Sequence, residues 1–120
     1  AAAELFYEQI RRVGDDENLR VLVLKLLHAH HLDATSVLAL EELLEYLKEK
    51  NCHVLLCEVR KDALRILRNS GVLNRINRQN VFPHTMSNPT LSTAKAIKRA
   101  KYLVSGEKAK VTIYAESNLG

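Results

Sequence analysis

Apolar runs of strand length alternate along this chain with segments whose apolar residues are spaced as in helices. Residues 21–27 are apolar except for Lys25, and residues 52–59 form a second, largely apolar run. Runs of this kind predict strands covered on both faces, as in the centre of an α/β sheet. Residues 81–82 predict a short strand, and residues 111–114 alternate with period two and predict a fourth.

Four segments have helical spacing: residues 3–13, 35–50, 61–70, and a stretch that begins at Asn88-Pro89. We expect Asn88 to be the N-cap of that last helix and Pro89 its first residue. The predicted buried stripes are Phe6, Ile10 and Val13 in the first helix; Val37, Leu40, Leu43, Leu44 and Leu47 in the second; Ala63, Leu64 and Leu67 in the third; and Leu91, Ala94 and Ile97 in the fourth.

Helix boundaries are marked by a few special residues. Gly14 and Gly71 are expected to end the first and third helices, and Asp33 or Thr35 to cap the second. The resulting order of elements predicts a single α/β domain with a largely parallel sheet flanked by about four helices. The 120 residues are enough for one such domain.

Composition narrows the class of protein. The chain is 47% hydrophobic and 27% charged, which is typical of a soluble globular domain, and its apolar runs are far shorter than the roughly 18 residues of a membrane span. The first residues are expected to form a helix and not a signal peptide, and we interpret the lack of an initiator Met as the mark of a piece of a longer protein. Cys52 and Cys57, about 16 Å apart if they share one strand, are expected to be free, buried thiols.

The net charge of +4 permits an anionic partner. Aromatic residues make up only 5% of the chain and are not interleaved with the basic residues, so we expect no nucleic-acid partner. A candidate basic contact surface for lipid headgroups or an acidic protein lies on the fourth predicted helix, at Lys95, Lys98, Arg99 and Lys101.

The junction after the first predicted strand carries the strongest candidate chemistry. A helix that begins there leaves N–H groups free, so Thr35, Ser36 and Val37 are a candidate anion or nucleotide contact. Thr35 and Ser36 are also candidate phosphorylation sites, although their interpretation as capping residues is favoured. His28, His30 and His31 permit a metal site, but no Cys or acidic cluster accompanies them, and no metal or other cofactor is predicted.

Known enzyme patterns do not occur in the chain. It has neither a glycine-rich phosphate loop nor a serine in a nucleophile elbow. His31, Asp33 and Ser36 lie on one turn, where consecutive residues rarely reach the geometry of a catalytic triad. The prediction is therefore a protein that is not an enzyme.

Taken in order, several segments resemble the STAS domain, which SulP-type anion transporters share with bacterial anti-sigma-factor antagonists. The resemblance runs from about residue 5 to residue 100. It is carried by Leu32-Asp33-Ala34-Thr35-Ser36, by Leu40-Glu-Glu-Leu43, by the predicted strand at 54–59, by Ser70-Gly71-Val-Leu73, by Asn80-Val81-Phe82-Pro83 and by the helix around residues 94–100.

The resemblance implies a role for the turn at residues 33–36. In the antagonists the residue after the turn's Asp is a serine that a partner kinase phosphorylates, whereas this chain has Ala34. Ala34 and the Asn-Val-Phe-Pro segment are more similar to the SulP transporters. We therefore expect Asp33, Ala34, Thr35 and Ser36 to form an interaction surface in a regulatory domain at the cytoplasmic face of the membrane.

The partners that this resemblance implies are the transporter's own membrane domain, a second copy in a homodimer, or a regulatory protein. The transported anion would be of the sulfate or bicarbonate type. The alternative is a stand-alone antagonist that binds an anti-sigma kinase.

Two departures from the family pattern concern the ends of the chain and the turn. The family usually has one or two strands before the first helix, and Ser36 stands where a glycine is common. The C-terminal segment, residues 105–120, contains the predicted strand at 111–114. We expect this strand either to fill the vacant position in the sheet or to pair with another chain.

Overall fold

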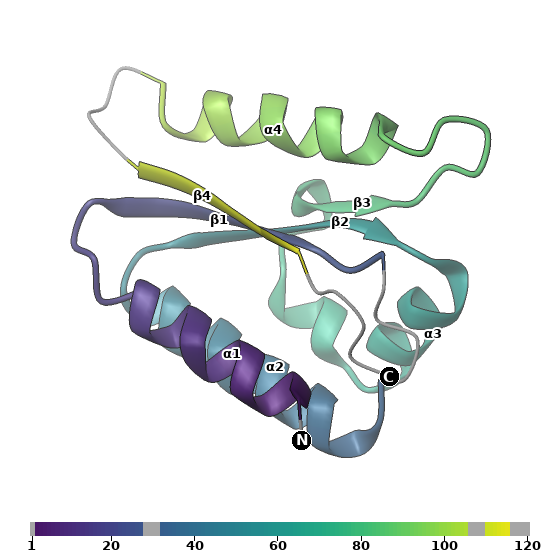
Figure 1. Cartoon of the computed structure of the whole chain (residues 1–120), viewed down its shortest axis with the longest axis horizontal. Helices are drawn as coiled ribbons and strands as arrows, with labels where there is room; N and C mark the ends of the chain where they lie inside the picture. Colours follow the sequence, from purple (N-terminus) through teal and green to yellow (C-terminus); the bar gives the residue numbers. More distant parts are fainter. Residues whose placement is uncertain (1, 28–31, 106–109, 116–120) are drawn as a thin grey trace.

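The computed structural model describes residues 2–27, 32–105 and 110–115, and within them four parallel strands form one sheet between two layers of helices (Figure 1). Among these residues no helix is both long enough and apolar enough to cross a bilayer. The α/β fold is as predicted, and the sheet is parallel throughout. In chain order the elements are α1 (Ala2–Val13), β1 (Leu19–Lys25), α2 (Ala34–Glu49), β2 (His53–Val59), α3 (Lys61–Asn69), the 3-10 helices η1 (Val72–Arg75) and η2 (Arg78–Asn80), β3 (Val81–Pro83), α4 (Leu91–Leu103) and β4 (Lys110–Ala115).

The order of strands explains why α4 lies apart from the other helices. The sheet has the order β3-β2-β1-β4, so the chain moves outward from β1 to β3 and then returns to the far side of β1. Crossovers between parallel strands are right-handed, so a reversal of direction places the next helix on the opposite face. Accordingly α1, α2 and α3 cover one face and α4 covers the other (Figure 1).

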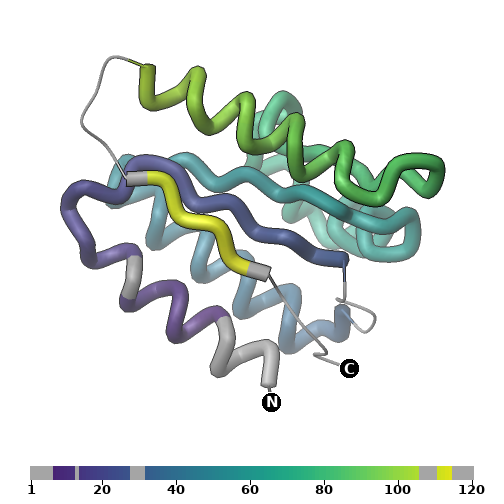
Figure 2. The backbone as a smooth tube through the Cα atoms, turned by 45° about the horizontal axis from the view of Figure 1, so that its top comes forward, coloured from purple at the N-terminus to yellow at the C-terminus, as the bar shows by residue number. Residues whose placement is uncertain are grey.

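Strand β4 fills the sheet position beside β1 (Figure 2). Of the two predicted outcomes, pairing within the sheet and pairing with another chain, the structure therefore shows the first. It pairs in parallel, with Val21 opposite Val111 and Leu24 opposite Tyr114. Tyr114 packs on the core beneath the sheet, whereas Val111 and Ile113 are exposed. β4 is thus an edge strand of the described sheet, with an apolar and partly exposed outer face.

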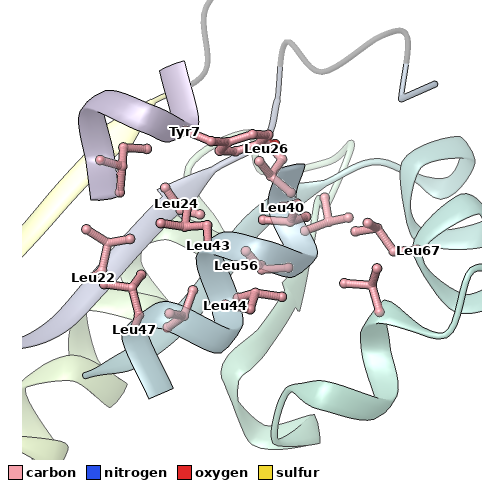
Figure 3. Close-up of a cluster of buried hydrophobic side chains, with 14 of the residues drawn as sticks. Tyr7, Leu22, Leu24, Leu26, Leu40, Leu43, Leu44, Leu47, Leu56 and Leu67 are labelled. Carbon is pink, nitrogen blue, oxygen red and sulfur yellow. The ribbon is translucent and has the colours of Figure 1, made fainter. Parts of the chain in front are cut away.

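A leucine-rich core fills the space between the sheet and helices α1, α2 and α3 (Figure 3). The stripe predicted for α2 is confirmed, because Val37, Leu40, Leu43, Leu44 and Leu47 are all buried there. The same cluster also includes Tyr7 and Ile10 of α1, Leu22 and Leu24 of β1, Leu56 of β2, and Ala63 and Leu67 of α3.

The apolar face predicted for α4 is wrong. Ala96 and Ala100 are the residues that α4 buries against Val21 and Val23 of β1, together with Leu55 and Cys57 of β2. Ala94 is exposed, and Leu91 and Ile97 are only half-buried. The small alanine side chains let the helix approach the sheet closely, so they, and not the larger residues, face the strands.

Two predicted boundaries also need correction. β1 runs two residues earlier than residues 21–27, from Leu19 to Lys25. α4 begins at Leu91 with Thr90 as its N-cap, so Asn88 and Pro89 do not start the helix. Asn88 instead belongs to a turn, in which its carbonyl oxygen accepts a hydrogen bond from the N–H of Leu91. The helix starts late because Glu58 of β2 accepts a hydrogen bond from the N–H of Thr93 in its first turn.

The two glycines predicted to end helices act for different reasons. Gly71 follows α3 with φ of +87°, the left-handed conformation that glycine adopts without steric cost. Gly14 is buried against α2, and a Cβ atom there would lie 2.6 Å from Cδ2 of Leu47. Gly14 therefore permits the close packing of α1 on α2.

The cysteine prediction is confirmed. Cys52 and Cys57 are free and buried.

We expect Leu40→Ala to lower the free energy of unfolding by about 2–5 kcal/mol, because the substitution leaves a cavity in the leucine core. Leu38, two residues earlier on the same helix, is 56% exposed and serves as the control. Leu38→Ala should change stability by less than about 0.5 kcal/mol. Urea unfolding followed by circular dichroism measures both, and equal losses would contradict this description of the core.

Candidate functional site

The turn at the start of α2 is held by a hydrogen bond between two of its own residues. Oδ1 of Asp33 accepts a hydrogen bond from the backbone N–H of Ser36 at 2.8 Å, so Asp33 and not Thr35 is the N-cap. This bond from the Ser36 backbone holds the pKa of Asp33 below its ordinary value of 3.8. The turn therefore carries a fixed negative charge at neutral pH.

The residues of this turn differ in their access to solvent. Asp33, Ala34 and Thr35 are exposed, whereas Ser36 is only 5% exposed and Val37 is buried. Thr35 is therefore the one hydroxyl of the turn that a kinase or a ligand reaches directly. The structure brings these residues together at the start of α2, as the sequence predicted.

The histidine predictions lie outside the described residues, because His28, His30 and His31 fall between the described segments. Within the described ranges, no group of three or more His, Cys, Asp or Glu side chains is placed to hold a metal ion.

A groove between α2 and α3 adjoins the turn. It has a volume of about 590 Å³, and its lining includes Val37 and Leu38 of α2, Ile66 of α3, and the turn residues Asp33 and Ala34. Leu38 is a large apolar side chain that is mostly exposed there. A partly apolar groove beside a charged turn suits contact with the surface of another protein.

Sequence reasoning missed Glu58, the only acidic residue in the apolar run of β2. Glu58 is 1% exposed and has φ of +52°, at a bulge where the register between β2 and β3 shifts. In a regular strand, Glu58 would share the face of Leu56 and point into the leucine core. The bulge changes this alternation, so that Val59 joins the leucine core and the Glu58 side chain bonds to α4.

The Glu58 carboxylate accepts hydrogen bonds on both oxygens. Nδ1 of His84 lies 2.8 Å from Oε1, and Thr93 donates to Oε2 from its backbone N–H at 3.1 Å and from its hydroxyl at 2.5 Å. An ionised carboxylate can only accept, so Nδ1 of His84 carries the proton. Ser92 completes the network by accepting from the Glu58 backbone N–H at 2.8 Å.

These bonds also set the ionisation of the cluster. Burial on its own would raise the pKa of Glu58, but the hydrogen bonds from His84 and Thr93 outweigh it and lower the pKa from 4.5 to about 2. Burial raises the pKa of the neighbouring Cys57 thiol. The thiol is therefore protonated, and its sulfur lies 3.7 Å from the hydroxyl oxygen of Thr93. Because the Thr93 hydroxyl donates its own hydrogen to Glu58, the Cys57 thiol is the donor in this contact.

The same carboxylate explains where α4 begins. Thr93 is the third residue of the helix, and its N–H has no partner within the helix. Thr90 makes no side-chain cap bond, and Glu58 supplies the acceptor from another element. A negative charge at a helix N-terminus is also favoured by the helix dipole. Asn88-Pro89 is a local start signal that this contact overrides.

The predicted basic surface of α4 is present in part. Lys95, Lys98 and Lys101 are exposed, as expected. Arg99 is half-buried, and its Nε donates to Oδ1 of Asn80 at 3.0 Å, so it ties α4 to η2 and does not belong to the free surface.

We expect Glu58→Gln to lower the free energy of unfolding by about 1–3 kcal/mol at pH 7, because an amide cannot accept on both sides and one donor loses its partner. A carboxylate whose pKa is depressed in the folded state stabilises the fold above its unfolded pKa, and this contribution is lost as pH falls through the folded pKa. The difference between the wild type and Glu58→Gln should therefore shrink between about pH 5 and pH 2.

Denaturant unfolding at a series of pH values measures this difference. Glu42→Gln, at an exposed position of α2, is the control and should show no comparable change. A difference for Glu58→Gln that stays constant down to pH 2 would contradict the depressed pKa.

Comparison with known proteins adds one positive finding. The family model described as the STAS domain matches residues 1–87, a range that includes the Asp33 turn and Glu58 and ends before α4. A search of curated proteins finds no match.

Proposed function

The chain belongs to the STAS domain family, and from this membership we propose that it is the regulatory and interaction domain of a SulP-like secondary anion transporter. In this role the domain lies at the cytoplasmic face of the membrane and contacts the transporter's own membrane domain. Selection of the sulfate- or bicarbonate-type anion belongs to that membrane domain.

The observation that carries this proposal is the side chain at position 34. In the antagonist branch, which the chain also resembles, the residue after the turn's Asp carries the hydroxyl that a kinase phosphorylates. Ala34 is exposed at this position but has no hydroxyl, and the hydroxyl of Ser36 is buried. The absence of the usual phosphorylation site favours the transporter branch.

A non-catalytic role is supported by the state of the reactive side chains. Cys57 and Glu58 are fully buried, and Thr93, their shared hydrogen-bond partner, belongs to the network that holds α4 in place. A substrate has no direct access to the Cys57 thiol or to the Glu58 carboxylate. The exposed Asp33 turn with the adjoining groove is a surface that remains available to a partner.

The alternative is a stand-alone antagonist that binds an anti-sigma kinase. The exposed hydroxyl of Thr35 favours it, because Thr35 lies in the first turn of α2. A phosphate there would be stabilised by the helix dipole and by free N–H groups.

The sequence encoded upstream of Ala1 distinguishes the two roles. For the transporter domain we expect ten or more hydrophobic segments long enough to span a bilayer. A short strand-forming leader after an initiator Met is the outcome expected of an antagonist, and it would overturn the proposal. Incubation with a candidate serine kinase, followed by intact-mass spectrometry, is a second check. Stoichiometric phosphate on Thr35 would also favour the antagonist.

The lysines of α4 supply a further test, since we propose that they face anionic lipid headgroups. Each lysine near such a surface contributes about 1 kcal/mol, so Lys95→Glu, Lys98→Glu and Lys101→Glu together should weaken binding to phosphatidylglycerol vesicles at least a hundredfold. Co-sedimentation with vesicles at low salt measures this binding.

The control is a triple variant with the same change of charge on α3. Its substitutions fall at Lys61, Arg65 and Arg68, which are also exposed. Glutamate at these three positions should leave most of the vesicle binding intact. An equal loss in both triple variants would show that net charge, and not the α4 surface, determines the binding.

A further inference from the structure

A hollow of about 320 Å³ opens at the amino ends of the strands. The Asp33 turn lies at the opposite end of the sheet, where the strands have their carboxyl ends. The hollow lies between the end of α2, the start of β2 and the segment formed by η1 and η2. Its polar lining consists of Lys48, Asn51, His53, Arg75, Asn77 and Asn80.

The charges around the hollow favour an anion. Lys48 and Arg75 line it, and no carboxylate is among its lining residues. Burial raises the pKa of the Cys52 thiol, which also lines the hollow, to about 11, so this group is neutral at pH 7. A metal cation would find no charged ligand here, whereas an anion meets two cationic groups.

The two cations differ in their existing partners. Arg75 pairs with Glu41 at 3.4 Å and with Glu45 at 3.1 Å, but its side chain is 48% exposed. Exposed pairs of this kind contribute little, so an anion can compete for the guanidinium. Lys48 is exposed and has no ion pair with any residue that the structure describes.

Asn80 supplies a donor with a defined orientation. Asn80 is 5% exposed, and its Oδ1 accepts from Nε of Arg99. Because an arginine side chain can only donate, this bond fixes the carbonyl side of the amide toward α4. The NH₂ group is left without an acceptor in the described part of the chain, and Asn80 lines the hollow.

We propose that this hollow binds a small oxyanion of the phosphate or sulfate class, with Lys48 and Arg75 supplying charge and the Asn80 NH₂ group a directed hydrogen bond. Tetrahedral oxyanions accept several hydrogen bonds at once, which matches two cations and an oriented amide. The site is independent of the transporter role and lies away from the α2 N-terminus.

Amide NMR spectra recorded during titration with sodium phosphate, and separately with sodium sulfate, test the proposal against sodium chloride at matched ionic strength. We expect saturable shifts of the Asn80 side-chain NH₂ signal and of the backbone at residues 51–54 and 75–80. Saturation with both salts supports the shared oxyanion chemistry, and saturation with phosphate alone narrows the ligand to a phosphoryl group.

Two variants locate the binding. Lys48→Ala should weaken it about tenfold, the effect of losing one hydrogen bond to a charged group. Lys95→Ala removes the same charge from α4 and should leave the affinity unchanged. Asn80→Asp preserves the shape and the acceptor for Arg99 but replaces the NH₂ donor with negative charge, so it should abolish binding while thermal unfolding reports an intact fold.

Three results would overturn the proposal. One is a set of shifts that sodium chloride reproduces, which would indicate general screening of charge. Another is an equal loss of affinity in Lys48→Ala and Lys95→Ala. The third is binding by a folded Asn80→Asp protein with the affinity of the wild type.

Discussion

The position of α4 depends on one buried carboxylate. Glu58 adopts a left-handed conformation that costs a residue other than glycine about 1–2 kcal/mol, and its charge is removed from water. Three charge-assisted hydrogen bonds, one from His84 and two from Thr93, each contribute about 1.5–3 kcal/mol and offset these costs. Because α4 alone covers its face of the described sheet, this contact fixes the second layer of the fold (Figure 1).

The placement of α4 has consequences on both of its sides. On the inner side, Nε of Arg99 donates to Oδ1 of Asn80, a residue that lines the hollow at the amino ends of the strands. On the outer side, Lys95, Lys98 and Lys101 are exposed as a basic surface. Glu58, at the carboxyl end of β2, thus helps to position Arg99 and Asn80 at the opposite end of the sheet.

The sequence predicted well those features that depend on local pattern. The order of elements, the apolar stripe of α2 and the left-handed Gly71 all follow from periodicity or from the conformational freedom of one residue. The start and the buried face of α4 do not, because its cap lies 35 residues earlier in the chain, in Glu58, and its inner face is selected by close approach to β1. The lone acid within an apolar strand was the available signal for this cluster. The turn at Asp33 was predictable because its capping bond is local.

The Asp33 turn has properties that suit a permanent contact better than a switch. A phosphoserine switch works by adding negative charge and acceptor oxygens at a helix N-terminus. Asp33 places a negative charge at the N-terminus of α2, and the hydrogen bond that it accepts from the Ser36 N–H lowers its pKa. Ala34 removes the hydroxyl at the position beside it, which leaves Thr35 as the exposed hydroxyl of the turn. The hollow lined by Lys48, Arg75 and Asn80 is a separate place on the fold, at which we propose that a small anion binds.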